Sequence, residues 1–313
     1  MSTGLSVLGI DTSCYTTSAA LARDGEIVAF ERRLLPVPGG ERGLRQSEAV
    51  FAHVKQLPDV LSAILTAGPV GAVSVSVKPT DAEESYMPVF ACGRSFARSI
   101  AAALHVPLFE TTHQRGHIRA AMIGTDIRPG DMLAVHLSGG TTDVLLVEKG
   151  KITAMGSSLD LHAGQLVDRV GVSMDLSFPA GPALEKLAMQ SKGAGSRLKA
   201  SVSGGNCHLS GAETQLYGLL KSGLSREDAA MEVYDLLART LLKMLCFARD
   251  QSGVSNVLLA GGVASSGILR TLMQERNEKR RMGLSLTFGN PRYCSDNAAG
   301  VALIGEEKWL GGQ

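Results

Sequence analysis

The feature that most constrains the fold is an internal duplication of one pattern of strands and turns. The segments GIDTSCYTTSAALARDGEIV, at residues 9–28, and AVHLSGGTTDVLLVEKGKIT, at residues 134–153, share a single layout. Each has an apolar strand, a turn of small hydroxyl-bearing residues, a second strand, a turn of charged residues and glycine, and a third strand. Two copies of one such unit predict a chain built from two similar halves.

The rest of the chain supplies helices and further strands to both halves. Strands are expected at 5–10, 16–21, 27–32, 73–77, 132–137, 143–148, 256–260 and 284–288, and helices at 46–65, 92–104, 162–170, 180–190, 213–222, 226–251, 265–276 and after 297. Pro58 predicts a break in the first helix. The order predicts a two-lobed α/β fold with a ligand cleft between the lobes. We expect residues 1–106 plus 292–313 to form the N-terminal lobe, and residues 107–291 to form the second lobe with a helical insertion.

Composition sets broad limits on location and partners. The 313 residues carry a net charge of +1, which gives no electrostatic reason to expect or exclude nucleic acid. Five scattered cysteines without a CxxC pair indicate reduced thiols. We see neither a signal peptide nor an apolar run of about 20 residues, so we expect a cytoplasmic protein that does not span a membrane.

Three glycine-rich turns indicate contacts between the backbone and an anion. They are Ser138-Gly139-Gly140, Ala260-Gly261-Gly262 and the FPAGP segment at 178–182. Glycine lets backbone amides approach a phosphate closely, and a helix that starts there adds a favourable dipole. The chain has neither a P-loop nor a GxGxxG turn after its first strand. Its duplicated hairpins instead resemble the RNase H-like fold of the actin, sugar-kinase and heat-shock-chaperone ATPase superfamily, which predicts a bound nucleotide.

The stretch TTHQRGH places His113 and His117 four residues apart. On a helix this spacing puts both imidazoles on one face, where they could share a metal ion, although such a pair also arises by chance. The stretch lacks the glutamate of the zinc-protease motif HExxH, because Gln114, Arg115 and Gly116 fill the gap. No general base is therefore built in between the two histidines.

Motifs along nearly the whole chain resemble those of one family. GIDTSC resembles GIETSC, FAHVKQLPDVL resembles an R-x-H helix with His53 in the histidine place, HQRGH resembles HxEGH, and HLSGGTTD resembles LVSGGHT. DLHAGQLVDRVG followed by FPAGPALEKLA, then LAGGVASSGILR and YCSDNAAGVALIG, resemble three further motifs in the same order. The chain is thus similar to the TsaD-type (glycoprotease-like) tRNA N6-threonylcarbamoyladenosine transferase family, as a divergent member.

This resemblance implies an activity, a metal and a substrate site. The implied reaction moves a threonylcarbamoyl group from threonylcarbamoyl-adenylate to N6 of a tRNA adenosine next to the anticodon. His113, His117 and Asp296 would hold one divalent metal, iron or zinc, that reaches nucleotide phosphate. The residues implied to bind the adenylate are His136, Leu137, Ser138, Gly139, Gly140, Asp168, Gly181, Gly261, Gly262 and Ser266. The implied partners are tRNA, an accessory paralogue and an adenylate-forming enzyme.

Several positions depart from the family pattern. Tyr15 and Thr16 stand in place of an Asp-Glu pair, Arg115 in place of the glutamate of HxEGH, and Ser266 in place of an asparagine. The glycine-rich TAGPGL stretch is replaced by SVKPTDAEESYMPVFACG, at residues 76–93. No catalytic acid or base is assigned. Two other functions stay open: a non-catalytic paralogue that binds nucleotide and metal within a complex, and, less favoured, a metalloprotease.

Overall fold

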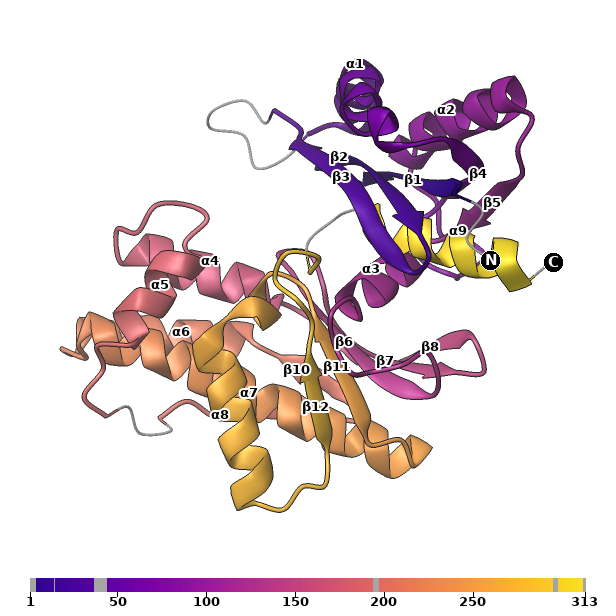
Figure 1. Ribbon diagram of the computed structural model, residues 1–313. Helices are drawn as coiled ribbons and strands as arrows, with labels where there is room; N and C mark the ends of the chain where they lie inside the picture. The colour runs from indigo at the N-terminus through magenta and orange to yellow at the C-terminus, as the bar shows by residue number, and fades with distance from the viewer. Residues whose placement is uncertain (1–3, 14, 37–43, 194–196, 295–297, 312–313) are drawn as a thin grey trace. The chain divides into compact units, whose positions relative to one another are not determined.

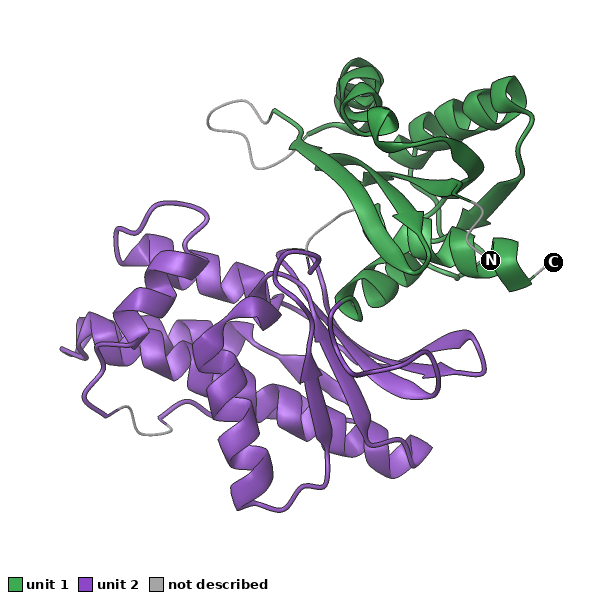
Figure 2. Cartoon of the chain, in the orientation of Figure 1, with its two compact units in different colours: residues 1–123, 295–313 green, residues 124–294 purple. Residues whose placement is uncertain are grey.

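The computed structural model describes residues 4–13, 15–36, 44–193, 197–294 and 298–311 (Figure 1). The chain forms two compact units, residues 1–123 with 295–313, and residues 124–294 (Figure 2). The sequence placed the division near residues 106 and 292. In the structure residues 107–123, which include the histidine pair, belong with the first unit.

The first unit is built on a five-stranded sheet of order β3-β2-β1-β4-β5. Its strands are β1 (Ser6–Ser13), β2 (Thr16–Arg23), β3 (Glu26–Leu34), β4 (Val70–Ser76) and β5 (Leu108–Thr111). Its helices are α1 (Gln46–Ile64), η1 (Leu65–Ala67), α2 (Val89–Leu104), α3 (His113–Ala121) and α9 (Ala299–Gly311).

The second unit is built on a five-stranded sheet of order β12-β11-β6-β7-β8, with a separate two-stranded hairpin. Its strands are β6 (Met132–Leu137), β7 (Thr142–Glu148), β8 (Lys151–Ser157), β9 (Ser201–Ser203), β10 (Asn206–His208), β11 (Asn256–Ala260) and β12 (Ser285–Phe288). Its helices are α4 (Ala163–Ser173), α5 (Gly181–Ala188), α6 (Ser210–Lys221), α7 (Arg226–Ser252), η2 (Val263–Ser265) and α8 (Gly267–Lys279).

The two five-stranded sheets have the same topology. In the first, β1, β2 and β3 form an antiparallel meander, and β4 and β5 extend the sheet in parallel from β1. In the second, β6, β7 and β8 form the meander, and β11 and β12 extend the sheet in parallel from β6. The duplication and the predicted α/β fold class are therefore confirmed.

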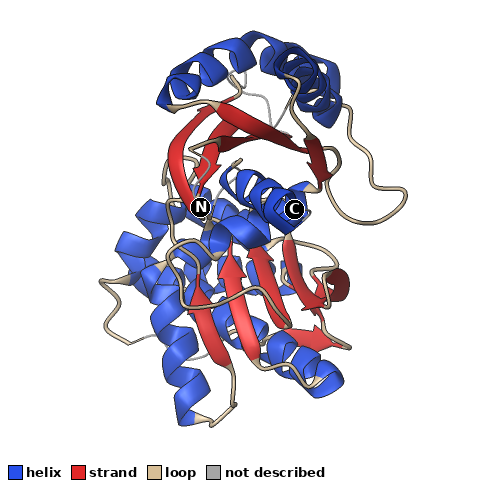
Figure 3. Ribbon diagram, turned by 45° about the vertical axis from the view of Figure 1, so that its right-hand side comes forward, coloured by secondary structure: helices blue, strands red, loops and turns tan. Residues whose placement is uncertain are grey.

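The alternation of side chains along β1 places its residues on two faces of the first sheet. Helices α1 and α2 cover one face and α9 covers the other (Figure 3). A Cβ on Gly9 would lie 2.5 Å from the backbone nitrogen of Ala302 in α9, whereas Thr12 contacts α2 through the amide of Gly93. Asp11, two residues from Gly9, consequently projects on the side of α9.

The predicted break at Pro58 is wrong, because α1 continues through this residue to Ile64. Pro58 is exposed, and so is Val54, whose carbonyl would have accepted the missing amide proton. Water can therefore satisfy that carbonyl. The opposite face of α1 buries Leu57, Val60 and Leu61 in the core, and this burial outweighs the loss of one hydrogen bond.

The second unit has the larger core. Helix α7 is buried along most of its length, and its side chains join those of β6, α4 and α5 in one apolar cluster. None of the helices in the described ranges is both long enough and apolar enough to cross a membrane.

Candidate functional site

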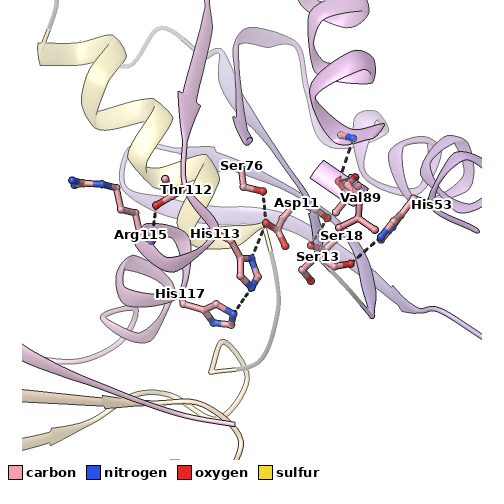
Figure 4. A network of polar contacts seen from close by, with 12 residues as sticks. Asp11, Ser13, Ser18, His53, Ser76, Val89, Thr112, His113, Arg115 and His117 are labelled. Carbon is pink, nitrogen blue, oxygen red and sulfur yellow. Dashed lines mark hydrogen bonds and ion pairs between the residues drawn. The ribbon is translucent and has the colours of Figure 1, made fainter. Parts of the chain in front are cut away.

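The predicted pair of histidines lies at the start of α3. Thr112 is the N-cap of this helix, and its hydroxyl accepts a hydrogen bond from the backbone amide of Arg115. The Nε2 atoms of His113 and His117 face each other at 2.9 Å, with their rings nearly perpendicular (Figure 4). The helical spacing thus puts both imidazoles on one face, as the sequence predicted. His117 is only 5% exposed, so water barely reaches it.

A carboxylate from the first strand meets this histidine pair. Asp11 is fully buried, and its Oδ1 atom lies 2.9 Å from Nδ1 of His113 (Figure 4). The hydroxyl of Ser76, on the neighbouring strand β4, also donates to Oδ1. Because β1 and β4 pair in parallel with Gly9 opposite Ser74, Asp11 and Ser76 share the face that α9 covers. The second oxygen, Oδ2, is buried and has no hydrogen-bond partner among the described residues.

The donor set fits a divalent metal in part. Two imidazole nitrogens bound to one tetrahedral zinc stand roughly 3.3 Å apart, since each Zn–N bond is about 2.0–2.1 Å. The two facing Nε2 atoms, at 2.9 Å, need only a small opening to reach that separation. Asp296, the third predicted ligand, lies outside the described residues. Within the described ranges no cluster of three His, Cys, Asp or Glu side chains forms a complete ligand set.

The segment after β4 is bound to the start of α3. Asp81 forms two hydrogen bonds with the guanidinium of Arg115, at 2.9 and 2.5 Å, and accepts a third from the hydroxyl of Thr112. The carbonyls of residues 78 and 79 accept the amides of residues 113 and 114. The cation at position 115 is thus balanced by an acid from the segment that replaces the glycine-rich stretch. Together these bonds hold the histidine helix against the loop.

Close backbone contacts bring two of the predicted nucleotide-binding turns together in the second unit. A Cβ on Gly164, in the first turn of α4, would lie 2.7 Å from the nitrogen of Gly139 and the carbonyl oxygen of Ser138. Gly261 has a φ of +99°, and a Cβ there would overlap the carbonyl of Leu137. The turn after β6 therefore packs against the start of α4 and the end of β11.

At three positions of these turns the backbone and the packing do not require glycine: Gly139, Gly140 and Gly262. None has a φ in the left-handed region. In the described part of the chain, no atom lies within 4 Å of a Cβ built on any of the three. The Cα side of these three residues is consequently open to a ligand that approaches the backbone closely, although the Gly140 amide itself donates to the hydroxyl of Ser138 at 3.2 Å. This openness is what a phosphate-binding turn requires.

Asp168 holds the turn that precedes α5. Its Oδ1 accepts the amide of Ala180 at 2.8 Å, while the hydroxyl of Tyr234 donates to the carbonyl of Gly181 at 3.2 Å. Burial raises the pKa of Asp168 above its usual value, and the amides of Ala180 and Gly181 oppose this shift. One carboxylate oxygen is therefore engaged by the backbone of the predicted binding turn.

Ser266 and His136 complete the predicted substrate residues. Ser266 is the N-cap of α8; its hydroxyl accepts the amide of Leu269 and donates to Glu185 of α5 at 3.0 Å. His136 lies directly opposite Asp143 on the neighbouring strand β7. Burial raises the pKa of Asp143, and the nearby His162 opposes that shift. Their roles toward an adenylate stay predictions.

His53 has a structural place. It is fully buried in α1, with Nε2 bound to the carbonyl of Ser13 and Nδ1 to the hydroxyl of Thr17, both at 2.8 Å. Burial lowers its pKa, although the Ser13 carbonyl and Asp11 act in the opposite direction. Both ring nitrogens of His53 are therefore engaged by neighbouring groups in the core.

Sequence reasoning did not single out three residues that support the histidine pair: Asp11, Ser76 and Asp81. Asp11 had a signal, because it is the one acid in the apolar run LSVLGIDTS of a buried strand. Ser76 and Asp81 had none, since their contacts depend on how β4 and the following segment meet α3.

Comparison with known sequences points to one family. The sequence profile described as tRNA N6-adenosine threonylcarbamoyltransferase matches residues 86–303. The chain is 30% identical over 330 residues to the tRNA N6-adenosine threonylcarbamoyltransferase of Symbiobacterium thermophilum, covering 100% of this chain and 94% of the relative. It is 27% identical to a probable bifunctional tRNA threonylcarbamoyladenosine biosynthesis protein of Methanothermobacter thermautotrophicus, covering 96% of this chain. The chain spans only 55% of that relative's length.

Solved structures share the fold at low sequence identity. HypF from T. kodakarensis matches with a TM-score of 0.65 and 14% identity, over 98% of this chain and 48% of that protein. The activator of the 2-hydroxyisocaproyl-CoA dehydratase from Clostridium difficile matches with a TM-score of 0.56 and 14% identity, over 99% and 97% of the two chains. A glucokinase of the ROK family from Streptomyces griseus also matches, at a TM-score of 0.56 and 12% identity, over 96% and 99%. These likenesses concern the fold alone.

Proposed function

The chain belongs to the tRNA N6-adenosine threonylcarbamoyltransferase family, and on that basis we propose that it transfers a threonylcarbamoyl group to N6 of a tRNA adenosine. The donor in this proposal is threonylcarbamoyl-adenylate, and the acceptor adenosine lies next to the anticodon. The observation that carries the proposal is the family match over residues 86–303. That range contains the histidine pair and every predicted adenylate-binding residue.

The proposed adenylate site uses the open glycines of the second unit. Among the described residues no atom lies near the Cβ positions of Gly139, Gly140 and Gly262, so the phosphate of the donor can approach the backbone of these turns closely. Asp168 and Ser266 each hold the start of a helix, α5 and α8 respectively, by accepting a backbone amide. Their part is to hold the turns in place, which positions the carbamoyl carbon for attack by the adenosine amine.

The proposed metal site uses the histidine pair of the first unit. His113 and His117, with Asp296, would hold one divalent ion, iron or zinc. The bound ion supplies positive charge for a phosphate oxygen. The supporting observation is the pair of Nε2 atoms that face each other at 2.9 Å from a buried helix face. The identity of the metal stays a prediction from the family resemblance.

A non-catalytic role in a complex is the second candidate. The specific observation in its favour is the pair Tyr15 and Thr16, which stand where the family has two acids. Thr16 is buried in strand β2, and the Tyr15 side chain is 45% exposed. Neither side chain supplies the carboxylate that the acids of the family pattern would place there. The sequence argument against a metalloprotease is unchanged, because Gln114 and the ion-paired Arg115, which lie between the two histidines, supply no carboxylate in the position of the HExxH glutamate.

A reconstituted assay tests the transferase. Purified protein is incubated with unmodified tRNA and threonylcarbamoyl-adenylate, with and without the accessory paralogue and the adenylate-forming enzyme of the same pathway. The tRNA is then digested, and modified adenosine is measured by mass spectrometry. We expect the modified nucleoside only when the tRNA has adenosine next to the anticodon. If the protein binds the adenylate but forms no modified adenosine, the transferase proposal is refuted and the role as a non-catalytic complex partner is favoured.

Metal analysis tests the ion site separately. We expect His117→Ala to lose most of the metal that co-purifies with the wild-type protein. His105→Asn, which changes an exposed histidine at the end of α2, is the matched control and should retain it. Equal metal content in wild type and His117→Ala would refute the metal site. The cytoplasmic location and the partner proteins stay predictions.

A further inference from the structure

The buried carboxylate of Asp11 has no part in the function proposed so far. It comes from the first strand, and it reaches the histidine helix across a separation of 102 residues in sequence. Asp11 is fully buried, so the fold removes its charge from water. A buried carboxylate is costly unless it is paired with a donor that needs it. The donors that it meets are His113 and Ser76 (Figure 4).

The contact with Asp11 bears on which nitrogen of the His113 ring carries a proton. An ionised carboxylate only accepts, so Nδ1 of His113 must carry the proton in its bond to Asp11. In the neutral ring this leaves Nε2 of His113 with a lone pair. Nε2 of His113 lies 2.9 Å from Nε2 of His117, so in this tautomer His117 is the ring that can donate in their contact. The lone pair of His113 that could bind a metal is therefore on Nε2, the atom that faces His117.

We propose that Asp11 is a positioning residue, which holds His113 in the tautomer protonated at Nδ1 and thereby presents its Nε2 atom as a metal ligand. This inference rests on the proposed metal site. Carboxylates that orient a ligating histidine typically contribute a factor of about 10–100 to metal affinity. Ser76 in turn orients the carboxylate, because its hydroxyl donates to the same oxygen that His113 uses.

If Asp11 served only to fill space and bind Ser76, an asparagine could replace it. An asparagine has nearly the same size, and it could bond to Ser76 and fill the same space without a buried charge. However, its amide can present either an oxygen or an NH2 group to His113. When the NH2 group faces Nδ1, the histidine must carry its proton on Nε2, and the lone pair is lost from the metal side. Asp11→Asn therefore separates the fit of the side chain from its control of the tautomer.

The first measurement concerns the wild-type protein alone. Long-range proton–nitrogen correlation spectra of the imidazoles, recorded without metal at roughly pH 8.5, about two units above the ordinary histidine pKa, distinguish the two neutral tautomers. His113→Gln assigns the signal of this ring. We expect His113 to carry its proton on Nδ1. A wild-type His113 with its proton on Nε2 and a bare Nδ1 overturns the inference, whatever any variant does.

The second measurement compares variants with Zn²⁺ as the probe, by competition with a chromophoric chelator. We expect Asp11→Asn to bind Zn²⁺ about 10–100-fold more weakly than wild type, and to lose the exclusive Nδ1-protonated form of His113, because the amide no longer requires that tautomer. Glu306→Gln is the matched control: it makes the same chemical change in a buried acid of the first unit, which accepts the amide of Gly25 rather than meeting a histidine. It should keep the His113 tautomer and bind Zn²⁺ within about 3-fold of wild type.

The outcomes separate this inference from the proposed function. A wild-type protein that binds no metal refutes the metal site, while its His113 tautomer still decides the role of Asp11. A wild-type protein that binds Zn²⁺ no more tightly than a folded Asp11→Asn variant refutes the role of Asp11 and leaves the metal site standing. If Asp11→Asn does not fold, Ser76→Ala takes its place. It keeps the carboxylate but removes the hydroxyl that orients it, and an unchanged Zn²⁺ affinity there counts against the inference.

Discussion

Replacing Gly139 by alanine should separate ligand binding from stability. Gly139 has no left-handed φ, and a Cβ built on it has no atom of the described residues within 4 Å. The fold should accept the methyl group without strain. Because alanine has fewer conformations than glycine in the unfolded chain, the free energy of unfolding should rise by about 0.4–1 kcal/mol.

The same methyl group would occupy space that a bound phosphate needs. If the Gly139 amide lies against the phosphate, an added Cβ forces the ligand away from the backbone. We expect AMP and ATP to bind at least ~10-fold more weakly, which corresponds to about 1.4 kcal/mol. Isothermal titration calorimetry measures the affinity, and chemical denaturation measures the stability of the same preparation.

Gly130→Ala is the matched control. Gly130 also belongs to the second unit, has no left-handed φ, and has open space at its Cβ position among the described residues, but it precedes β6 outside the predicted turns. It should gain similar stability and keep the nucleotide affinity. Wild-type affinity in Gly139→Ala, or an equal loss in both variants, would refute the argument that the open glycines serve a ligand.

Three further predictions concern pH, charge and packing. Burial by itself would raise the pKa of Asp160. The hydrogen bonds that its carboxylate accepts, chiefly from the start of α6, outweigh burial and lower the pKa to about 2. The pKa in the folded state is thus below the unfolded value, so the ionised carboxylate stabilises the fold above about pH 4, and this contribution is lost toward pH 2. We expect it to be about 1–2 kcal/mol, a figure already reduced for partial exposure. Denaturation of Asp160→Asn and wild type at both pH values measures the difference. A double-mutant cycle on Arg115 and Asp81 should give a coupling of about 1 kcal/mol, since both side chains are partly exposed. Gly9→Ala should cost about 3 kcal/mol in unfolding measurements, because its Cβ would meet the backbone of Ala302.

Each of these three has a contrary outcome. Equal acid sensitivity of Asp160→Asn and wild type would remove Asp160 as the source of that pH dependence. Additive effects in the double-mutant cycle would mean that the ion pair on α3 contributes nothing measurable. A Gly9→Ala protein of wild-type stability would show that α9 moves away from β1 at low cost.

The local elements were largely predictable from the sequence. Hydrophobic runs and turn residues located the two meanders, and their duplication predicted two sheets of the same topology. Pro58 was misjudged because its effect depends on whether the lost hydrogen bond faces water, which a sequence pattern does not state. The short strand β5 and the hairpin of β9 and β10 were missed, since three or four residues carry too little periodicity to be recognised.

By itself the sequence determined the family, the duplicated α/β architecture and the placing of His113 and His117 on one helical face. These follow from local spacing and from motifs in a fixed order, and neither needs knowledge of distant contacts. Only the tertiary structure decided that Asp11 meets His113, that Asp81 neutralises Arg115, and that Gly139 is open while Gly164 is closely packed. These contacts join segments far apart in the chain, so they depend on how strands and helices pack rather than on the period of any one element.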